Sequence, residues 1–250
     1  MASLEHQSVD KDLMSCLYGG PGAGKTTTAM ALAQELRGEG KVLLLDSGEG
    51  FVSMEAMPFL MEGVDIVPNT TSKELAAVTE ALTGKRAKAF EDYTVIVIDE
   101  LSSISAEVLE NVVRDRAGVT IGAELPEIEG KDYNPMTQII SAMIRRLQKV
   151  DGLHVIVIAH DREKEDKRRG LTISPQFPPM LLKELQKVMH ITGYQVARIG
   201  ANGKYTFEIQ ARPTVSVQAK SRIPNTPVVQ SPEEFVAFVS NWVVSGQIDR

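Results

Sequence analysis

The residues of this chain best suited to chemistry are eight near its amino end, which combine glycines with a lysine and a threonine. They run Gly19-Gly20-Pro21-Gly22-Ala23-Gly24-Lys25-Thr26 and match the spacing G-x-x-x-x-G-K-[ST]. Glycines let successive backbone N–H groups turn toward a phosphate chain. Lys25 is placed to reach the β- and γ-phosphates, and the Thr26 hydroxyl to complete the shell of a Mg²⁺ ion. The pattern predicts a site for ATP and Mg²⁺ at these residues and the following Thr27.

Two groups of carboxylates are candidates for the metal and the attacking water. The apolar run 94–98 ends in Asp99-Glu100, and a carboxylate at the carboxyl end of a parallel strand beside such a loop holds Mg²⁺. We therefore predict Asp99 as the metal-side carboxylate. Hydrolysis also needs a group that orients or deprotonates water. Glu100 and Glu49, which follows the apolar run 41–46, are both candidates, and the residues do not separate them.

A polar residue and a run of charges follow the apolar run 153–159. His160 stands at its tip, where it either senses the γ-phosphate or simply caps a strand. Residues 161–170 contain nine charged side chains in ten positions, which is usual for a solvated segment. Directly after His160, such a segment can also contact a polyanion. The predicted DNA-contacting residues are Arg162, Lys164, Lys167, Arg168 and Arg169.

A second pair of cations stands late in the chain. Lys220 and Arg222 follow the run 214–219. A cation inserted into a neighbouring subunit's nucleotide site stabilises charge developing on the γ-phosphoryl group. They are either such trans-acting catalytic residues, which requires an oligomer, or two surface cations at a strand end.

The elements that position these residues alternate along the chain. Strands are predicted at 13–18, 41–46, 64–67, 94–99 and 153–159, and helices at 27–36, 72–83, 102–116 and 135–150. Alternation with short connections predicts a three-layer α/β/α sandwich around a mainly parallel sheet. Runs at 189–199 and 204–210 predict an antiparallel hairpin, which the run 214–219 could extend, and a helix at 231–245 closes the chain.

The predicted organisation is one domain over residues 13–250, preceded by a flexible arm at 1–12. Residues 118–134 are predicted to be an acidic inserted loop, and 161–177 a charged loop. With 250 residues and one cysteine, Cys16, the composition excludes a disulfide framework and a cysteine-based zinc site. No apolar run approaches the length of a membrane span, so we expect a cytoplasmic protein.

Charge is unevenly divided along the chain, whose net charge is −6. Residues 1–135 carry 11 Lys and Arg against 23 Asp and Glu, whereas 136–250 carry 16 against 10. This asymmetry permits a basic face for a polyanion, or subunits that pack acidic side to basic side.

The order of these features resembles RecA-like ATPases. More narrowly, residues 155–166, which contain Ala159-His160-Asp161-Arg162, are similar to phage-encoded nucleotide-binding P-loop proteins that include single-strand annealing recombinases. The resemblance covers about residues 13–240. It implies a RecA-like core in which an additional strand lies between the phosphate-loop strand and the Asp99 strand. It also implies an ATPase of the host cytoplasm that binds single-stranded DNA and assembles into a ring or filament.

Two other functions remain open at this level. One is a P-loop kinase for a small metabolite, with residues 161–177 as a lid whose arginines clamp the phosphates. The other is a nucleotide-gated loading or interaction module that hydrolyses slowly. Aromatic residues make up only 5% of the chain, and the base-stacking candidates near the basic region are Tyr194, Tyr205 and Phe207.

Overall fold

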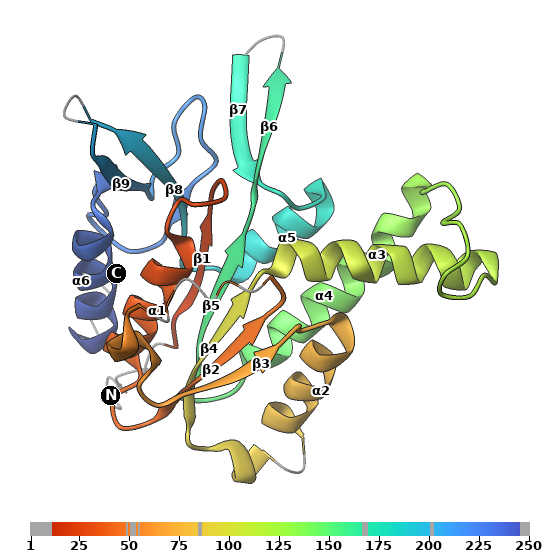
Figure 1. Cartoon of the computed structure of the whole chain (residues 1–250), viewed down its shortest axis with the longest axis horizontal. Coiled ribbons are helices and arrows are strands. Elements are labelled where there is room, and N and C mark those ends of the chain that lie inside the picture. Colours follow the sequence, from red (N-terminus) through yellow and green to blue (C-terminus); the bar gives the residue numbers. More distant parts are fainter. Residues whose placement is uncertain are drawn as a thin grey trace, which may run out of the picture.

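A central sheet covered by helices on both faces forms the body of the protein (Figure 1), seen in a computed structural model. The structure describes residues 12–48, 50, 54, 56–84, 87–166, 170–200 and 203–245, without the side chains of residues 87 and 166. The predicted arm at 1–12 thus falls almost wholly outside the described residues. No helix in the described ranges combines the length and the apolarity needed to cross a bilayer.

The main sheet is parallel in its centre and antiparallel at one side. Its order is β11-β9-β8-β1-β5-β4-β2-β3, with β10 also paired to β8. Its strands are β1 (Met14–Tyr18), β2 (Lys41–Asp46), β3 (Val64–Pro68), β4 (Tyr93–Asp99), β5 (His154–Ala159), β8 (Ile191–Ile199), β9 (Tyr205–Gln210), β10 (Lys220–Ser221) and β11 (Val229–Gln230). Strand β5 lies between β1 and β4, as the resemblance implies, and the predicted β8–β9 hairpin is confirmed.

Helices form the outer layers. They are α1 (Lys25–Leu36), α2 (Ser72–Thr83), α3 (Leu101–Ala117), α4 (Tyr133–Leu147), α5 (Pro179–Val188) and α6 (Pro232–Ser245). Helices α1 and α6 cover one face, and α2 to α5 cover the other. Alternate residues of each central strand point to opposite faces, so both faces are apolar and a separate core lies on each. The three-layer prediction is confirmed.

The charged segment after His160 folds differently from the prediction. Strands β6 (Asp161–Asp166) and β7 (Gly170–Pro175) pair as an antiparallel hairpin that projects from the body (Figure 1), rather than forming a loop. The alternating charges of β6 gave no strand signal, because neither face of this two-stranded ribbon is uniformly apolar. Helix α5 follows it and was not predicted, although Pro179 stands at its first position, where the fixed φ of proline suits a helix.

Two further expectations need correction or refinement. The run 214–219 does not extend the hairpin as a strand; it forms an isolated bridge at Val217, and β10 then pairs with the start of β8. Of the predicted acidic insert 118–134, residues 118–129 are irregular, Gly130–Asp132 form one helical turn, and the last two residues already belong to α4. Part of the insert's charge is internally paired, because Arg116 contacts both Glu129 and the buried Asp132.

Candidate active site

The phosphate loop joins β1 to α1 in the conformation that its glycines were predicted to allow. Gly22 and Gly24 adopt φ angles of +72° and +80°, a region that side chains with a Cβ rarely enter. Gly24 directly precedes α1, so the N-terminal N–H groups of that helix face the loop. Gly19 has a different requirement: a Cβ there would lie 2.0 Å from the backbone oxygen of Gln195 on β8.

Lys25 is buried inside the loop. Its Nζ donates to the backbone oxygens of Gly19 and Gly20, each at 2.9 Å. Burial lowers the pKa of Lys25, and the nearby carboxylates, chiefly Glu100, oppose that shift. The loop thus holds a cation at the place where phosphate oxygens would arrive.

Thr26 and Asp99 meet as the sequence predicts for a metal site. The Thr26 hydroxyl donates to Asp99 Oδ2 at 2.6 Å, and Asp99 is almost fully buried. Burial is the largest cause that raises the pKa of Asp99 to about 6, partly opposed by the Thr26 hydrogen bond. A Cβ on Gly50 would lie 2.6 Å from Asp99 Oδ2, so a larger residue there would displace that carboxylate.

This donor set fits Mg²⁺, which is usually held through one or two carboxylates together with substrate phosphates. A second carboxylate, Asp46, ends the neighbouring strand β2 in register with Asp99. Asp46 Oδ1 accepts from the backbone N–H of Gly50 at 3.0 Å. Its Oδ2 is buried and has no hydrogen-bond partner among the described residues, as expected for an oxygen beside a cation site.

Glu100 and His160 lie in direct contact. His160 Nε2 is 2.5 Å from Glu100 Oε2, and the Ser102 hydroxyl donates to Glu100 Oε1. The backbone N–H of His160 in turn donates to Ser102 Oγ at 3.1 Å. Serine 47 holds the Glu100 backbone, accepting from its N–H at 2.8 Å. The Glu100 carboxylate is therefore held from both sides.

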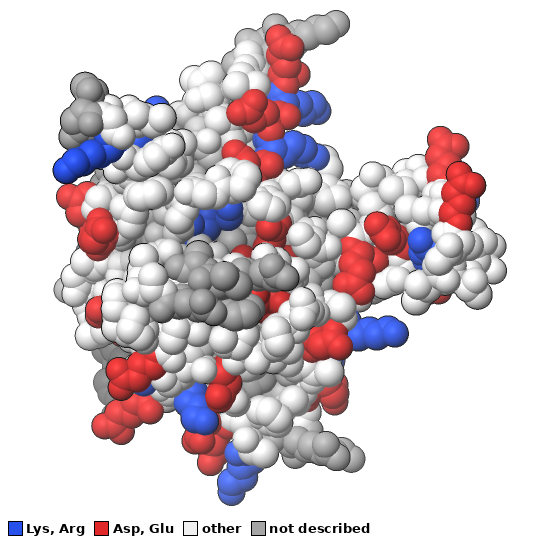
Figure 2. Space-filling view, in the orientation of Figure 1, with Lys and Arg blue, Asp and Glu red and all other residues white. Residues whose placement is uncertain are grey.

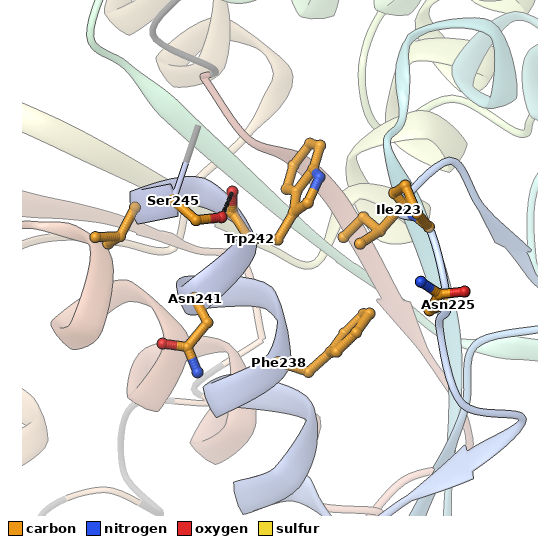
Figure 3. Close-up of a pocket in the computed structure, with 8 residues that line it drawn as sticks. Ile223, Asn225, Phe238, Asn241, Trp242 and Ser245 are labelled. Atoms are coloured by element: carbon orange, nitrogen blue, oxygen red, sulfur yellow. Dashed lines mark hydrogen bonds between the residues drawn. The ribbon is translucent and has the colours of Figure 1, made fainter. Parts of the chain in front are cut away.

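Lys25, Thr26, Asp99, Glu100 and His160 open onto one cavity of about 360 Å³. It is lined by the loop residues 22–27, by Gly48 and Gly50, and by Asp99, Glu100 and His160. Another cavity, of about 490 Å³, lies where Phe238 and Trp242 of α6 project toward Ile223 and Asn225 (Figure 3). Among the described residues, no phosphate-loop residue and no charged side chain lines this cavity beside α6, so it offers no cation to a phosphate.

Several predicted residues lie elsewhere or outside the described part. Four predicted residues fall outside the described residues: Glu49, Lys167, Arg168 and Arg169. The choice between Glu49 and Glu100 as the catalytic base therefore stays open. Arg162 and Lys164 lie on one face of the projecting hairpin.

The late cations Lys220 and Arg222 have partners within the chain. Lys220 Nζ donates to the backbone oxygen of Gln186, and Arg222 to that of Lys187. These are carbonyls at the C-terminal end of α5, where cations stabilise a helix. A trans-acting role stays a prediction, and it requires these bonds to be released.

The three aromatic candidates for base stacking lie in different surroundings. Tyr194 packs against Tyr18 with ring centroids 5.3 Å apart and is half-buried. Phe207 lies beside the phosphate loop, since a Cβ added to Gly24 would be 3.5 Å from its ring. Tyr205 and Phe207 are exposed, Tyr205 more so.

Sequence reasoning assigned no role to three residues of this site. Asp46 carries the same signal as Asp99, an acid at the carboxyl end of a buried strand, and could have been found by it. Ser102 and Gln195 carry no such signal. Gln195 is buried in β8 and donates to Thr28 of α1 at 2.9 Å, a contact between residues far apart in the chain.

Comparison with known proteins places this site in a family. The family model for an AAA domain matches residues 11–223, which include every described residue of the phosphate cavity. The chain belongs to this AAA domain family. It is thus a P-loop nucleotide-binding protein with an α/β fold.

More distant similarities are found among solved structures. The flagellar accessory protein FlaH from Methanocaldococcus jannaschii is 13% identical, with a TM-score of 0.48 over 87% of this chain and 88% of its own. The RadB recombinase is 15% identical, with a TM-score of 0.44 over 79% of each chain. A comparison with curated proteins found no match.

Proposed function

We propose that this AAA domain protein hydrolyses ATP with Mg²⁺, and that single-stranded DNA stimulates turnover by an oligomer in phage recombination or replication. The observation that carries the proposal is the single cavity shared by Lys25, the Thr26–Asp99 pair and the Glu100–His160 pair. This cavity combines an anion-binding loop, a metal-side carboxylate and a candidate base, which are the parts that phosphoryl transfer to water needs.

Each residue has a defined task in this proposal. The loop N–H groups and Lys25 bind the phosphates, and Thr26 and Asp99 would hold Mg²⁺, with Asp46 beside them. When bound, Mg²⁺ supplies positive charge that stabilises the transferring phosphoryl group. Glu100 orients the attacking water and accepts its proton, and His160 holds one oxygen of that carboxylate.

The DNA and oligomer parts of the proposal are supported by charge and resemblance. Arg162 and Lys164 provide cations on the hairpin that directly follows His160, so a polyanion bound there would be close to the catalytic carboxylate. Lys220 and Arg222 are the candidates to act on a neighbouring subunit's nucleotide.

The test is ATP turnover with and without single-stranded DNA, together with mass measurement in a non-hydrolysable ATP analogue. Lys25→Ala should abolish turnover, and Glu100→Gln should lower it at least about 100-fold if Glu100 is the base. Glu110→Gln, an exposed glutamate of α3, is the matched control and should retain full turnover. Glu49→Gln is tested in parallel, because the sequence leaves both glutamates open.

The outcomes separate the parts of the proposal. Full turnover by both the Glu49→Gln and the Glu100→Gln proteins would refute the base assignment. Turnover by a monomer that is indifferent to DNA, with Arg222→Ala silent, would refute the coupling to DNA and to a neighbouring subunit.

A further inference from the structure

A different cavity, separate from the phosphate cavity and from the one beside α6, lies directly behind the catalytic carboxylate. Its volume is about 480 Å³, and it opens at the base of the β6–β7 hairpin, between α3, the start of α4 and the segment 176–180. It is distinct from the phosphate cavity, because the two share no lining residue.

The walls of this cavity suit a flat ligand with hydrogen-bond acceptors. Tyr133, Met136, Phe177 and Pro178 supply aromatic and apolar surface. Arg162 supplies the cation: its Nε is buried and has no hydrogen-bond partner in the described ranges. No carboxylate is among the described residues that line the cavity, so nothing there repels a ligand rich in acceptors.

The hairpin above the cavity presents its positive charge on the same side. Side chains alternate along β6, so Arg162 and Lys164 share one face while Glu163 and Glu165 occupy the other. Figure 2 shows the blue side chains of the hairpin on the edge that faces α3. A phosphate backbone that follows this edge would bring its bases over the mouth of the cavity.

One residue connects this cavity to the chemistry. Ser102 lines the cavity and donates through its hydroxyl to Glu100 Oε1, while accepting from the His160 N–H. A ligand that displaces Ser102 would therefore change the position of the catalytic carboxylate.

We infer that this cavity receives one unstacked base of a single strand of DNA, and that Ser102, a positioning residue, transmits its occupancy to Glu100. The inference rests on the proposed DNA-dependent ATPase and specifies where the strand is read. The base would lie against Tyr133 and Phe177, with the Arg162 guanidinium donating to its acceptors.

The test compares binding of a labelled oligothymidylate with that of an abasic strand of the same length, by fluorescence anisotropy with a non-hydrolysable ATP analogue. Ala106→Leu fills the cavity from an exposed position of α3. Ala117→Leu, exposed at the end of the same helix and outside the cavity, is the matched control. Met180→Trp is a second filling variant at the exposed rim.

Stacking of one base on an aromatic side chain corresponds to a preference of about fivefold or more. We expect the unaltered protein and Ala117→Leu to bind oligothymidylate at least that much more tightly than the abasic strand. Both filling variants should lose this preference and the DNA stimulation of turnover, while their turnover without DNA is unchanged.

Four other outcomes would contradict a part of the inference or the function on which it rests. Equal binding of the two strands by the unaltered protein would overturn the base pocket and leave the DNA-dependent ATPase standing. A preference that survives both filling variants would also overturn it, and is the outcome expected if a partner protein occupies the cavity. Loss of the preference with stimulation intact would refute the role of Ser102. If neither strand binds, the proposed function itself fails.

Discussion

Replacing Gly19 by alanine tests whether the first glycine of the phosphate loop is required for packing rather than for phosphate binding. The added Cβ would lie 2.0 Å from the backbone oxygen of Gln195 and 3.1 Å from its carbonyl carbon. Gln195 lies within β8, which pairs with β1 on one side and β9 on the other. The obstructing atom is thus backbone held in a ladder and not the end of a flexible side chain.

The size of the effect follows from that geometry. The contact must widen from 2.0 Å to the 3.4 Å or more of ordinary van der Waals contact. Overpacking typically costs 1–3 kcal/mol, and moving paired backbone places Gly19→Ala at about 3 kcal/mol of unfolding free energy. For a chain of this length that corresponds to a fall of about 6–12 °C in Tm.

The neighbouring glycine supplies the control. A Cβ on Gly20 would have Asp161 Oδ1 at 3.9 Å as its nearest neighbour, and Gly20 is not in the left-handed region. Gly20→Ala should therefore leave the free energy of unfolding unchanged or raise it by up to about 1 kcal/mol. Urea unfolding of both proteins without nucleotide measures the difference. Equal free energies of unfolding for the two variants would show that packing against β8 does not require glycine at position 19.

Three further predictions concern other parts of the fold. Burial lowers the pKa of His154, and its Nδ1 accepts from the Leu13 N–H at 2.9 Å, which requires that nitrogen to carry no proton. Below about pH 6.5 the histidine of the unfolded chain binds a proton more readily than that of the folded chain. The free energy of unfolding therefore decreases as the pH is lowered, by at most about 1.4 kcal/mol per pH unit. Urea unfolding near pH 7 and pH 5 should show a smaller fall in His154→Asn, which keeps an acceptor without titrating. Burial raises the pKa of Cys16 to about 12, so we expect a thiol reagent at neutral pH to modify it only after denaturation. Arg222→Ala should lower the free energy of unfolding by about 0.5–1 kcal/mol, since it removes the donor to the Lys187 carbonyl; an unchanged urea midpoint would show that this cap contributes nothing.

The phosphate loop was predictable because its requirements are local. Its glycines, lysine and threonine are adjacent in sequence, and the following helix is fixed by its own residues. Asp99 was predictable for a related reason: the carboxyl ends of parallel strands meet at one edge, so an acid after a buried strand arrives near the loop.

The hairpin β6–β7 was not predictable by the same reasoning, whereas α5, which buries Leu181, Leu185 and Val188 at helical spacing, could have been. Periodicity identifies an element by the face that it buries, and β6 alternates basic and acidic side chains instead of apolar and polar ones. Lys220 and Arg222 are a further case. Their pattern left open trans-acting cations or two surface cations at a strand end, and only the fold shows that they donate to carbonyls at the C-terminal end of α5.

The sequence by itself determined a three-layer α/β chain with a loop for nucleoside triphosphate and a carboxylate beside it, since these depend on residue type and strand order. Only the tertiary structure decided that Ser102 and His160 hold Glu100, that the Gln195 backbone leaves no room for a Cβ at position 19, and that a cavity lined by Ser102 adjoins this site. The physical reason is that these are contacts between elements distant in the chain. Their distances depend on how strands and helices pack, and no local pattern encodes that packing.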